Sequence, residues 1–426
     1  MSVRCPFGRA LLAAALLTVG IGCGGEEPLV ACDIATRSCQ EDVYYALLRL
    51  RGDGFDPVAQ RPPIRTITRE DYCRAQDASR PDVEPDPEPD EPEPEPEDPP
   101  LVPWDFALHV LGLVTPTKTT GQARGDELCR AVAAFYSTST RSVTVIDSGP
   151  PADETPEERA GRERRETALL VHELVHALQD PELSGAQFDG TTDSNLTART
   201  LTEGEAAFYQ RIAEREMIDG DPEGHDWQTY YSRWLGEGRT NISDNRSPFF
   251  GVQWFIYPLG AQYLTDAWLG GGNAAVRRAY AHPRRYTQQF IAGYGHGAEV
   301  LDPPLSCPVA APSSSYARVK SDRFGALVLY GFMRRAGVPD QDAWPLAAAW
   351  NDDSIVVFFD QAAEIAVMTW VIRFEHEGDP ARVLELIELT DPRVRAQARG
   401  RDLIFSARSN EAATRDWNGG LDCALP

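Results

Sequence analysis

Apolar residues recur at the spacing of buried helices over several stretches of the chain. Residues three and four positions apart lie on one face of a helix, so each stretch predicts a helix that packs into a core. The stretches are Trp104–Val114, Ala168–Leu178, about Asn195–Met217, Phe255–Trp268, Phe324–Arg335 and Ala362–Phe374. Strand patterns are fewer, and the clearest is Arg141–Ile146, which follows Ala134–Tyr136. The pattern therefore predicts a predominantly helical fold with few strands.

The helix that contains Ala168–Leu178 has clear signals at both ends. Thr155 is an N-cap residue with Pro156 at the first helical position and Glu158 three residues after the cap, the arrangement of a capping box. Pro181 is expected to end the helix, because the residue before a proline avoids helical geometry. The first half of this helix is almost entirely charged, and the second half is nearly all apolar.

Three ionisable residues interrupt the apolar half: His172, Glu173 and His176. Residues four apart stack on one helix face, so the two histidines can bind one Zn²⁺ at about 2.0–2.1 Å each. Glu173 projects beside the pair, where it can take a proton from a zinc-bound water that attacks a carbonyl. The alternative, two solvent-facing histidines, conflicts with flanking leucines and valines that leave no polar face. The pattern indicates a hydrolytic zinc site.

A catalytic zinc keeps three protein ligands and an open position for water. Glu203, within the next predicted helix, is the expected third ligand. Gly204 follows it directly, and a glycine inside an apolar helix predicts a close approach to another backbone. Glu205 is expected to point to a different face. The weaker candidates lie in expected loops and are Asp189, Asp193 and His225.

The segment from His172 to His176, together with Thr202–Ala206, resembles the gluzincin branch of zinc metallopeptidases. It is most similar to a set of poorly characterised bacterial and archaeal surface proteins or lipoproteins of gluzincin type. The similarity covers about Trp104–Phe374. Further pieces that carry it are His176–Asp180, Phe188–Asp189, Tyr257–Gly260, Tyr280–Pro283, Thr287–Gln289, Asp322–Gly325 and Trp350–Asp353.

The resemblance implies an α+β, zincin-like domain. Such a domain has a small mixed sheet with an edge strand, the metal helix beneath the sheet and a helical C-terminal part. The interval between His176 and Glu203 is longer than in many gluzincins, which implies an inserted loop over or beside the site. The substrate-binding signature of aminopeptidases is missing near Arg141–Ile146, so the resemblance does not extend to an N-terminal exopeptidase.

A zinc peptidase also needs a group that stabilises the oxyanion formed during attack. Tyr257 is the first candidate for this catalytic role, since it lies in an apolar helix beside Pro258 and Gly260. His282 and His296 are the alternatives. A purely structural role remains open for each, because tyrosines often pack their ring in a core and bond their hydroxyl to a backbone group.

The N-terminus has the pattern of an export signal. Arg4 and Arg9 precede an apolar run, Ala10–Val19, which is too short to span a membrane. The next residues resemble a bacterial lipoprotein processing box with Cys23 as the acylated residue, which makes 1–22 the signal peptide. An ordinary secretory signal is the alternative. We therefore expect an exported, lipid-anchored protein of the cell envelope, at the outer membrane or cell surface.

An acidic, proline-rich linker is predicted at 80–101, between a short cysteine-containing segment at 23–79 and a catalytic domain at 102–426. Proline blocks helix and sheet bonding and the like charges repel, so the linker should be extended, at about 3.1 Å per residue. A tether to a membrane surface is its expected role. The segment before it either forms a small module of its own or packs on the larger domain.

Cysteine use fits an exported chain. Cys5 falls in the signal and Cys23 is assigned to the lipid, which leaves an even number for disulfides. These are Cys32, Cys39, Cys73, Cys129, Cys307 and Cys423. Three precede the linker and three follow it, so full pairing requires at least one bridge across it. The connectivity itself is open.

The formal net charge of −24 excludes a nucleic-acid partner, because phosphate binding requires an excess of Lys and Arg. The expected partners are a peptide or protein substrate and a membrane reached through the lipid anchor. We therefore expect a zinc metallopeptidase that acts outside the cytoplasm. Two other functions stay open: a zincin-derived surface protein that binds without turnover, and a zinc hydrolase of a non-peptide amide or ester.

Overall fold

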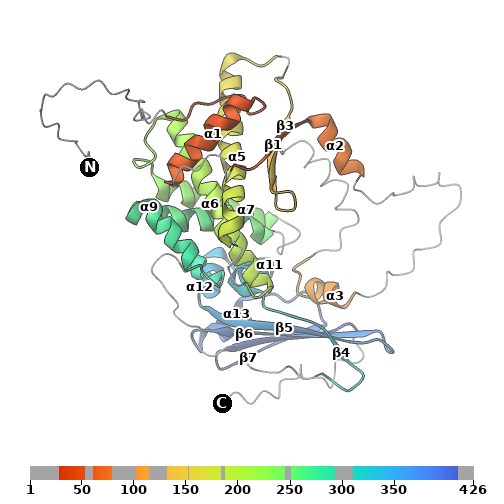
Figure 1. Cartoon of the computed structure of the whole chain (residues 1–426). Helices are drawn as coiled ribbons and strands as arrows, with labels where there is room; N and C mark the ends of the chain where they lie inside the picture. The colour runs from red at the N-terminus through yellow and green to blue at the C-terminus, as the bar shows by residue number, and fades with distance from the viewer. Residues whose placement is uncertain are drawn as a thin grey trace, which may run out of the picture.

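The computed structural model describes residues 28–52, 61–78, 102–114, 132–151, 153–183, 188–244, 251–292, 309 and 311–410. The predicted signal at 1–22, the proposed acylation site Cys23, the linker at 80–101 and His296 lie outside these residues. The described part is an α+β fold in which a helical upper part, with a small sheet at its side, lies over a larger sheet (Figure 1). Within the described ranges, every helix is too short or too polar to cross a bilayer.

The small sheet has three strands in the order β1-β3-β2. Strands β2 (Ala134–Ser137) and β3 (Ser142–Asp147) pair antiparallel, and β1 (Ile64–Thr68) pairs with β3 in parallel. The sheet is therefore small and mixed, as expected, and β2 forms one of its edges. The two strands expected from the sequence around 134–146 form its hairpin, whereas β1 comes from the segment before the linker.

The upper helices pack beside this sheet and share one core with it. The largest of them, α5, runs vertically through Figure 1 next to β3. Its apolar half supplies Leu170 and Leu174, and both are fully buried. The bounds are α1 (Arg37–Arg51), α2 (Arg69–Ala78), α5 (Pro156–Leu183), α6 (Thr192–Ile218), α7 (Trp227–Asp244) and α9 (Ile256–Ala281).

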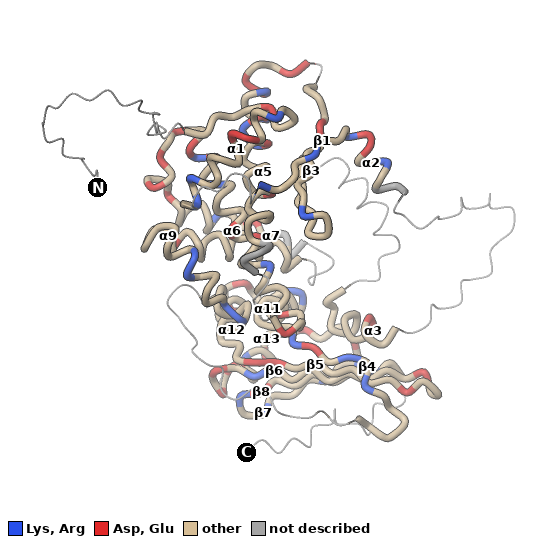
Figure 2. Tube along the Cα trace, viewed as in Figure 1, with Lys and Arg blue, Asp and Glu red and all other residues tan. Residues whose placement is uncertain are grey.

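The capping box predicted for α5 is present. The Glu158 carboxylate accepts from the backbone N–H of Thr155 at 2.9 Å, and the Thr155 hydroxyl accepts from the N–H of Glu158 at 3.3 Å. The helix continues to Leu183, past Pro181, so the predicted end was too early. Acidic and basic residues are intermixed along its outer half, at the top of Figure 2.

The segment before the linker packs on the larger domain. Tyr44 and Leu47 of α1 are completely buried in the core that contains Leu170. The Cys32–Cys39 disulfide connects the residues before α1 to the first turn of this helix. Cys73 is disulfide-bonded as well. Residues 80–101 therefore connect two parts of one packed body.

The lower part contains a five-stranded antiparallel sheet in the order β4-β5-β6-β8-β7. Short helices cover the face of the sheet that points to the upper helices (Figure 1). The strands are β4 (Ala317–Asp322), β5 (Trp350–Asp360), β6 (Ile365–Phe374), β7 (Val394–Arg399) and β8 (Asp402–Arg408). The helices are η1 (Val252–Phe255), α3 (Pro103–Val110), α10 (Gln288–Ile291), α11 (Gly325–Arg335), α12 (Asp340–Ala348) and α13 (Asp379–Leu386).

The expected helical C-terminal part is present only in part: helices α6 to α12 follow α5, but the last described residues form most of the five-stranded sheet. Ala362–Phe374, predicted as a helix, forms the turn after β5 and then the central strand β6. Its apolar side chains are buried on both faces, including Trp370 on one and Val371 on the other. A strand covered on both faces reads as a continuous apolar run, which periodicity alone does not separate from a buried helix.

Candidate metal centre

Helix α5 places His172 and His176 one turn apart on the same face. Their ring centroids are 4.8 Å apart, and the His172 side chain is about nine-tenths buried. The flanking Val171 and Val175 are completely buried, so packing fixes the helix face that carries the histidines. The arrangement follows from the spacing of four residues and from the apolar neighbours that the sequence supplies.

Helix α6 brings Glu203 to the same point. The Glu203 Oε2 atom lies 3.4 Å from the Nε2 atom of His172 and 3.4 Å from that of His176. Zinc–ligand bonds of about 2.0–2.2 Å in a tetrahedron separate neighbouring ligand atoms by roughly 3.3–3.5 Å. The three potential ligand atoms all lie within 4.8 Å of one another, and within the described residues they form a group that could hold a metal ion.

The position of Glu203 depends on a close helix crossing. A Cβ atom on Gly204 would lie 2.4 Å from the Gly260 backbone of α9, and one on Gly260 would lie 1.7 Å from the Thr200 carbonyl oxygen. Side chains are thus excluded at both positions, and the close backbone approach predicted from Gly204 is confirmed. The crossing also carries Tyr257, three residues before Gly260, to the metal group.

Glutamine side chains are hydrogen-bonded to the Nδ1 atom of each histidine, the ring nitrogen that faces away from Glu203. The Nδ1 atom of His172 lies 3.0 Å from Gln210 Oε1, and the Nδ1 atom of His176 lies 2.9 Å from Gln179 Oε1. A histidine that donates from Nδ1 presents the lone pair of Nε2 to a metal. Neither glutamine was assigned a role from the sequence, although Gln179 lies within the His176–Asp180 piece and its spacing of three residues from His176 on α5 could have indicated the contact.

Glu173 lies between the metal group and the edge strand. Its Oε2 atom accepts a hydrogen bond of 2.7 Å from the backbone N–H of Tyr136 in β2. Burial raises the pKa of Glu173, and the two histidines and this backbone N–H oppose the change. The carboxyl group is therefore oriented by the backbone and placed beside the metal group without being one of its three members.

The Glu203 charge is stabilised although the site is largely desolvated. Burial works against the charged form, yet hydrogen bonds from His172 and His176 hold the pKa of Glu203 well below its usual range. Burial likewise opposes the charged form of His176, whereas Glu203 raises the pKa of this histidine. A carboxylate that faces two imidazoles in a desolvated site is a donor set that suits zinc.

Tyr257 lies at the rim of the group. Its ring centroid is 6.4 Å from that of His172. Burial and the neighbouring Glu203 carboxylate raise the pKa of Tyr257 to about 12. The phenol therefore keeps its proton at neutral pH and can donate a hydrogen bond. His282, an alternative candidate, is exposed just beyond the end of α9.

The weaker candidates for the third ligand lie elsewhere. His225 stacks edge-on against Trp227 at 4.7 Å between ring centroids. Asp189 accepts from Thr191 and pairs with Arg323 at 3.0 Å. The long interval between His176 and Glu203 is mostly helix, with residues 184–191 between α5 and α6. Residues 184–187, where the expected inserted loop would fall, lie outside the described part.

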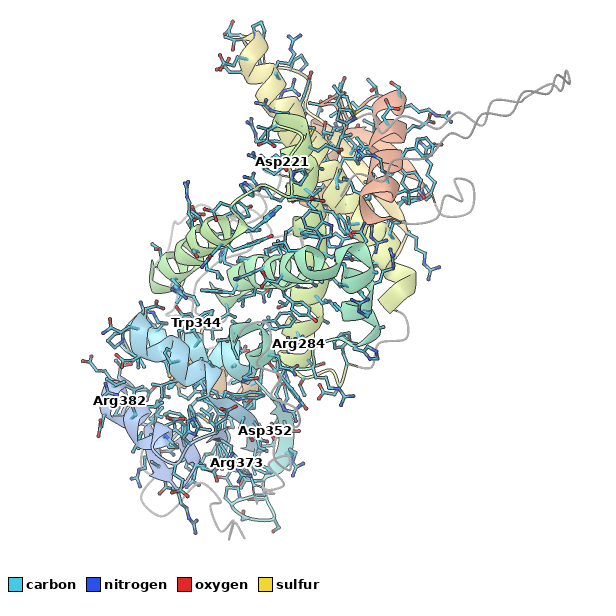
Figure 3. All side chains as sticks on the ribbon, turned by 90° about the vertical axis from the view of Figure 1, so that its left-hand side faces the viewer. Asp221, Arg284, Trp344, Asp352, Arg373 and Arg382 are labelled. Atoms are coloured by element: carbon cyan, nitrogen blue, oxygen red, sulfur yellow. A yellow bond between two sulfur atoms is a disulfide. The ribbon has the colours of Figure 1, made fainter. Side chains whose placement is uncertain are left out.

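Asp193 belongs to a buried polar junction and does not lie in a loop as expected. It occupies the first turn of α6, is completely buried, and accepts from the backbone N–H of Thr287 at 3.0 Å. Asp353 of β5 accepts at 2.9 Å from each of the Phe324 and Gly325 N–H groups in the same region. Figure 3 labels Asp352, the residue before Asp353 in β5, in the lower part of the molecule. The Asp322–Gly325 and Trp350–Asp353 pieces thus join the two parts of the molecule.

Asp193 should make stability depend on pH. Burial raises its pKa to about 7, above the ordinary value of 3.8. The folded protein then binds this proton more tightly than the unfolded chain, so the stabilisation is complete below about pH 4 and is lost as pH rises through about 7. We expect the melting temperature of the protein to fall over this range, and Asp193→Asn to flatten the fall. Equal pH profiles for the two proteins in thermal melts would contradict this assignment.

Comparison with known proteins gives no match: no family model, no curated protein and no solved structure is similar to this chain.

Proposed function

We propose that this protein is an exported, lipid-anchored zinc peptidase with a gluzincin-like site. The observation that carries the proposal is the convergence of the His172 and His176 Nε2 atoms on one Glu203 oxygen at 3.4 Å each. Beside them stands Glu173, which has no place among the three ligands and is held toward the site by the Tyr136 N–H. A site that only binds a metal ion does not require a carboxylate such as Glu173 beside its ligands.

The proposed hydrolysis needs a general base beside the metal, and Glu173 is the residue placed to serve as one. His172, His176 and Glu203 would hold the zinc ion, which would lower the pKa of a bound water to about 7. Glu173 is the carboxylate beside the group that is not one of the three ligands, and burial raises its pKa above the ordinary value. It takes the proton of the attacking water and delivers it to the leaving amine. Residues Gln179 and Gln210 keep the two imidazoles in the orientation that presents Nε2.

A peptide substrate is favoured over other amides or esters by the edge strand next to Glu173. Strand β2 pairs with β3 on one side only, and its other edge faces the site, where the Tyr136 N–H already donates to Glu173. An extended peptide can add to such an edge through its main chain, with main-chain hydrogen bonds providing affinity. The edge is short, four residues, and therefore holds only a few residues of substrate.

Tyr257 is proposed as the hydrogen-bond donor to the oxyanion. Its half-buried hydroxyl stays protonated at neutral pH because the pKa is about 12. Loss of one such donor costs about 10²–10³-fold in turnover. We expect Tyr257→Phe to lower kcat by that order, with little change in KM or zinc content. A variant with normal kcat would remove Tyr257 from this role.

Digestion of a broad peptide library by the mature protein tests the function. We expect cleavage that stops with a zinc chelator and returns when zinc is added back. A protein that binds zinc and peptides but leaves every peptide intact would be the non-catalytic binding protein. Zinc-dependent hydrolysis of model esters or non-peptide amides without peptide cleavage would support the third possibility.

A further inference from the structure

A chain of buried polar groups leads from helix α1 to the metal group. Arg51, the last residue of α1, donates to Glu205 Oε1 from its Nε at 3.1 Å and from one Nη at 2.9 Å. The exposed fractions of the two side chains are 5% and 1%, so the pair is fully desolvated. Glu205 Oε2 accepts at 2.8 Å from the amide nitrogen of Gln179, and Gln179 Oε1 faces His176 Nδ1.

The donors and acceptors in this chain can be arranged in only one way. Arg51 can only donate and the Glu205 carboxylate can only accept. The side of Gln179 that faces Glu205 must therefore be its NH₂ group, which also donates to the Thr202 carbonyl at 2.9 Å. The carbonyl oxygen of Gln179 then faces His176, so His176 must donate from Nδ1.

We propose that Gln179 is the positioning residue of His176, and that the buried Arg51–Glu205 pair holds Gln179 in the required orientation. The inference rests on the proposed zinc site. It adds a role for the segment before the acidic linker: α1 supplies Arg51 and is therefore part of the metal site. Gln179 is 2% exposed and bridges three helices through its contacts with His176, Glu205 and Tyr280.

Substitution of Gln179 by methionine tests the positioning role, because methionine fills a similar volume and makes no strong hydrogen bond. Loss of an outer partner of a metal-bound histidine lowers metal affinity by about 10–100-fold. We expect Gln179→Met in the full chain to weaken zinc binding by about tenfold, measured by competition with a chromophoric chelator. The visible spectrum of the cobalt-substituted protein should shift, because a freed imidazole changes the ligand geometry.

The double variant Arg51→Met with Glu205→Met tests the ion pair. Apolar replacement of a whole buried pair is often neutral for stability, whereas removal of one partner leaves a buried charge. We expect the double variant to fold, to bind zinc several-fold more weakly than the unaltered protein, and to show the cobalt spectral shift in smaller degree. Gln179 keeps the Thr202 carbonyl as a partner, which is why the loss is smaller than in Gln179→Met.

A matched control exists between the same two helices. Arg49 of α1 pairs with Glu216 of α6 at 2.8 Å at the surface, away from His176. Arg49→Gln with Glu216→Gln should leave zinc affinity and the cobalt spectrum unchanged. An equal loss in this control, or unaltered zinc binding and cobalt spectra in Gln179→Met, overturns the inference and leaves the zinc site itself intact. A full chain that binds no zinc at all overturns both the inference and the proposed function.

Discussion

Glu173→Gln is expected to leave zinc bound and to abolish almost all hydrolysis. Proton transfer by a positioned side chain contributes about 10²–10⁴-fold to a rate, and this carboxyl group has two transfers to perform. Glutamine has nearly the same size and can still accept from the Tyr136 N–H through its amide oxygen. The variant therefore keeps the hydrogen bond that orients residue 173 and loses only the capacity to take a proton. Steady-state kinetics and metal content on the same preparation measure both effects.

Glu166→Gln is the matched control for this substitution. Glu166 is a partly buried carboxylate on the same helix, paired with Arg162 at 2.8 Å, and burial raises its pKa as it does that of Glu173. It lies two turns from the metal group, so its neutralisation should leave turnover unchanged. Normal turnover in Glu173→Gln would rule out the mechanism. A similar loss in both variants would mean that the effect arises from a general change in α5.

Local sequence signals predicted helix α5 and the spacing of its two histidines. The capping box at Thr155 and the spacing of His172 and His176 involve neighbours in the chain, and such geometry follows directly from the helix. Glu203 was reached by a less direct argument, from the glycine beside it. The close backbone approach predicted at Gly204 is confirmed, because Gly204 packs directly against the backbone of Gly260.

The supporting groups could not be predicted in the same way. Arg51 and Glu205 are 154 residues apart, and Gln179 joins residues from three helices. Nothing in the local pattern shows that a glutamate two residues after the proposed ligand is 1% exposed and paired with an arginine from before the linker. Long-range pairs of this kind depend on the packing of α1 against α5 and α6, which hydropathy does not specify.

The large sheet was missed for a different reason. Strand β6 is a run of apolar residues with Thr369 as one of few polar members, and its side chains are buried on both faces of the sheet, Trp370 in the core under the helices and Val367 in a smaller cluster on the other face. Alternating apolar and polar residues indicate a strand with one solvent-exposed face, and neither face of β6 is exposed to solvent. The short sheet beside the site shows the converse, since its hairpin was recognised from Arg141–Ile146.

Glu203→Ala should remove most zinc binding. The substitution removes one of three protein ligands. Zinc affinity should therefore fall by more than the about 10–100-fold that is typical when a hydrogen-bond partner of a ligand is lost. The two imidazoles stay in place, since Gln179 and Gln210 hold their Nδ1 atoms independently of Glu203. The variant should therefore retain weak binding through the histidine pair. Titration with zinc against a chelator of known affinity distinguishes weak binding from none.

Glu214→Ala on the same helix provides the comparison for Glu203→Ala. Glu214 is a surface carboxylate paired with Arg211, three turns beyond Glu203, and its removal should leave zinc affinity unchanged. Normal zinc content in Glu203→Ala would mean that the third ligand is misassigned, even though both Nε2 atoms lie 3.4 Å from its carboxylate. Loss of zinc in Glu203→Ala with retention in Glu214→Ala would place the metal at this group. Hydrolysis should then fall in parallel with zinc occupancy, because the same metal activates the water that Glu173 deprotonates.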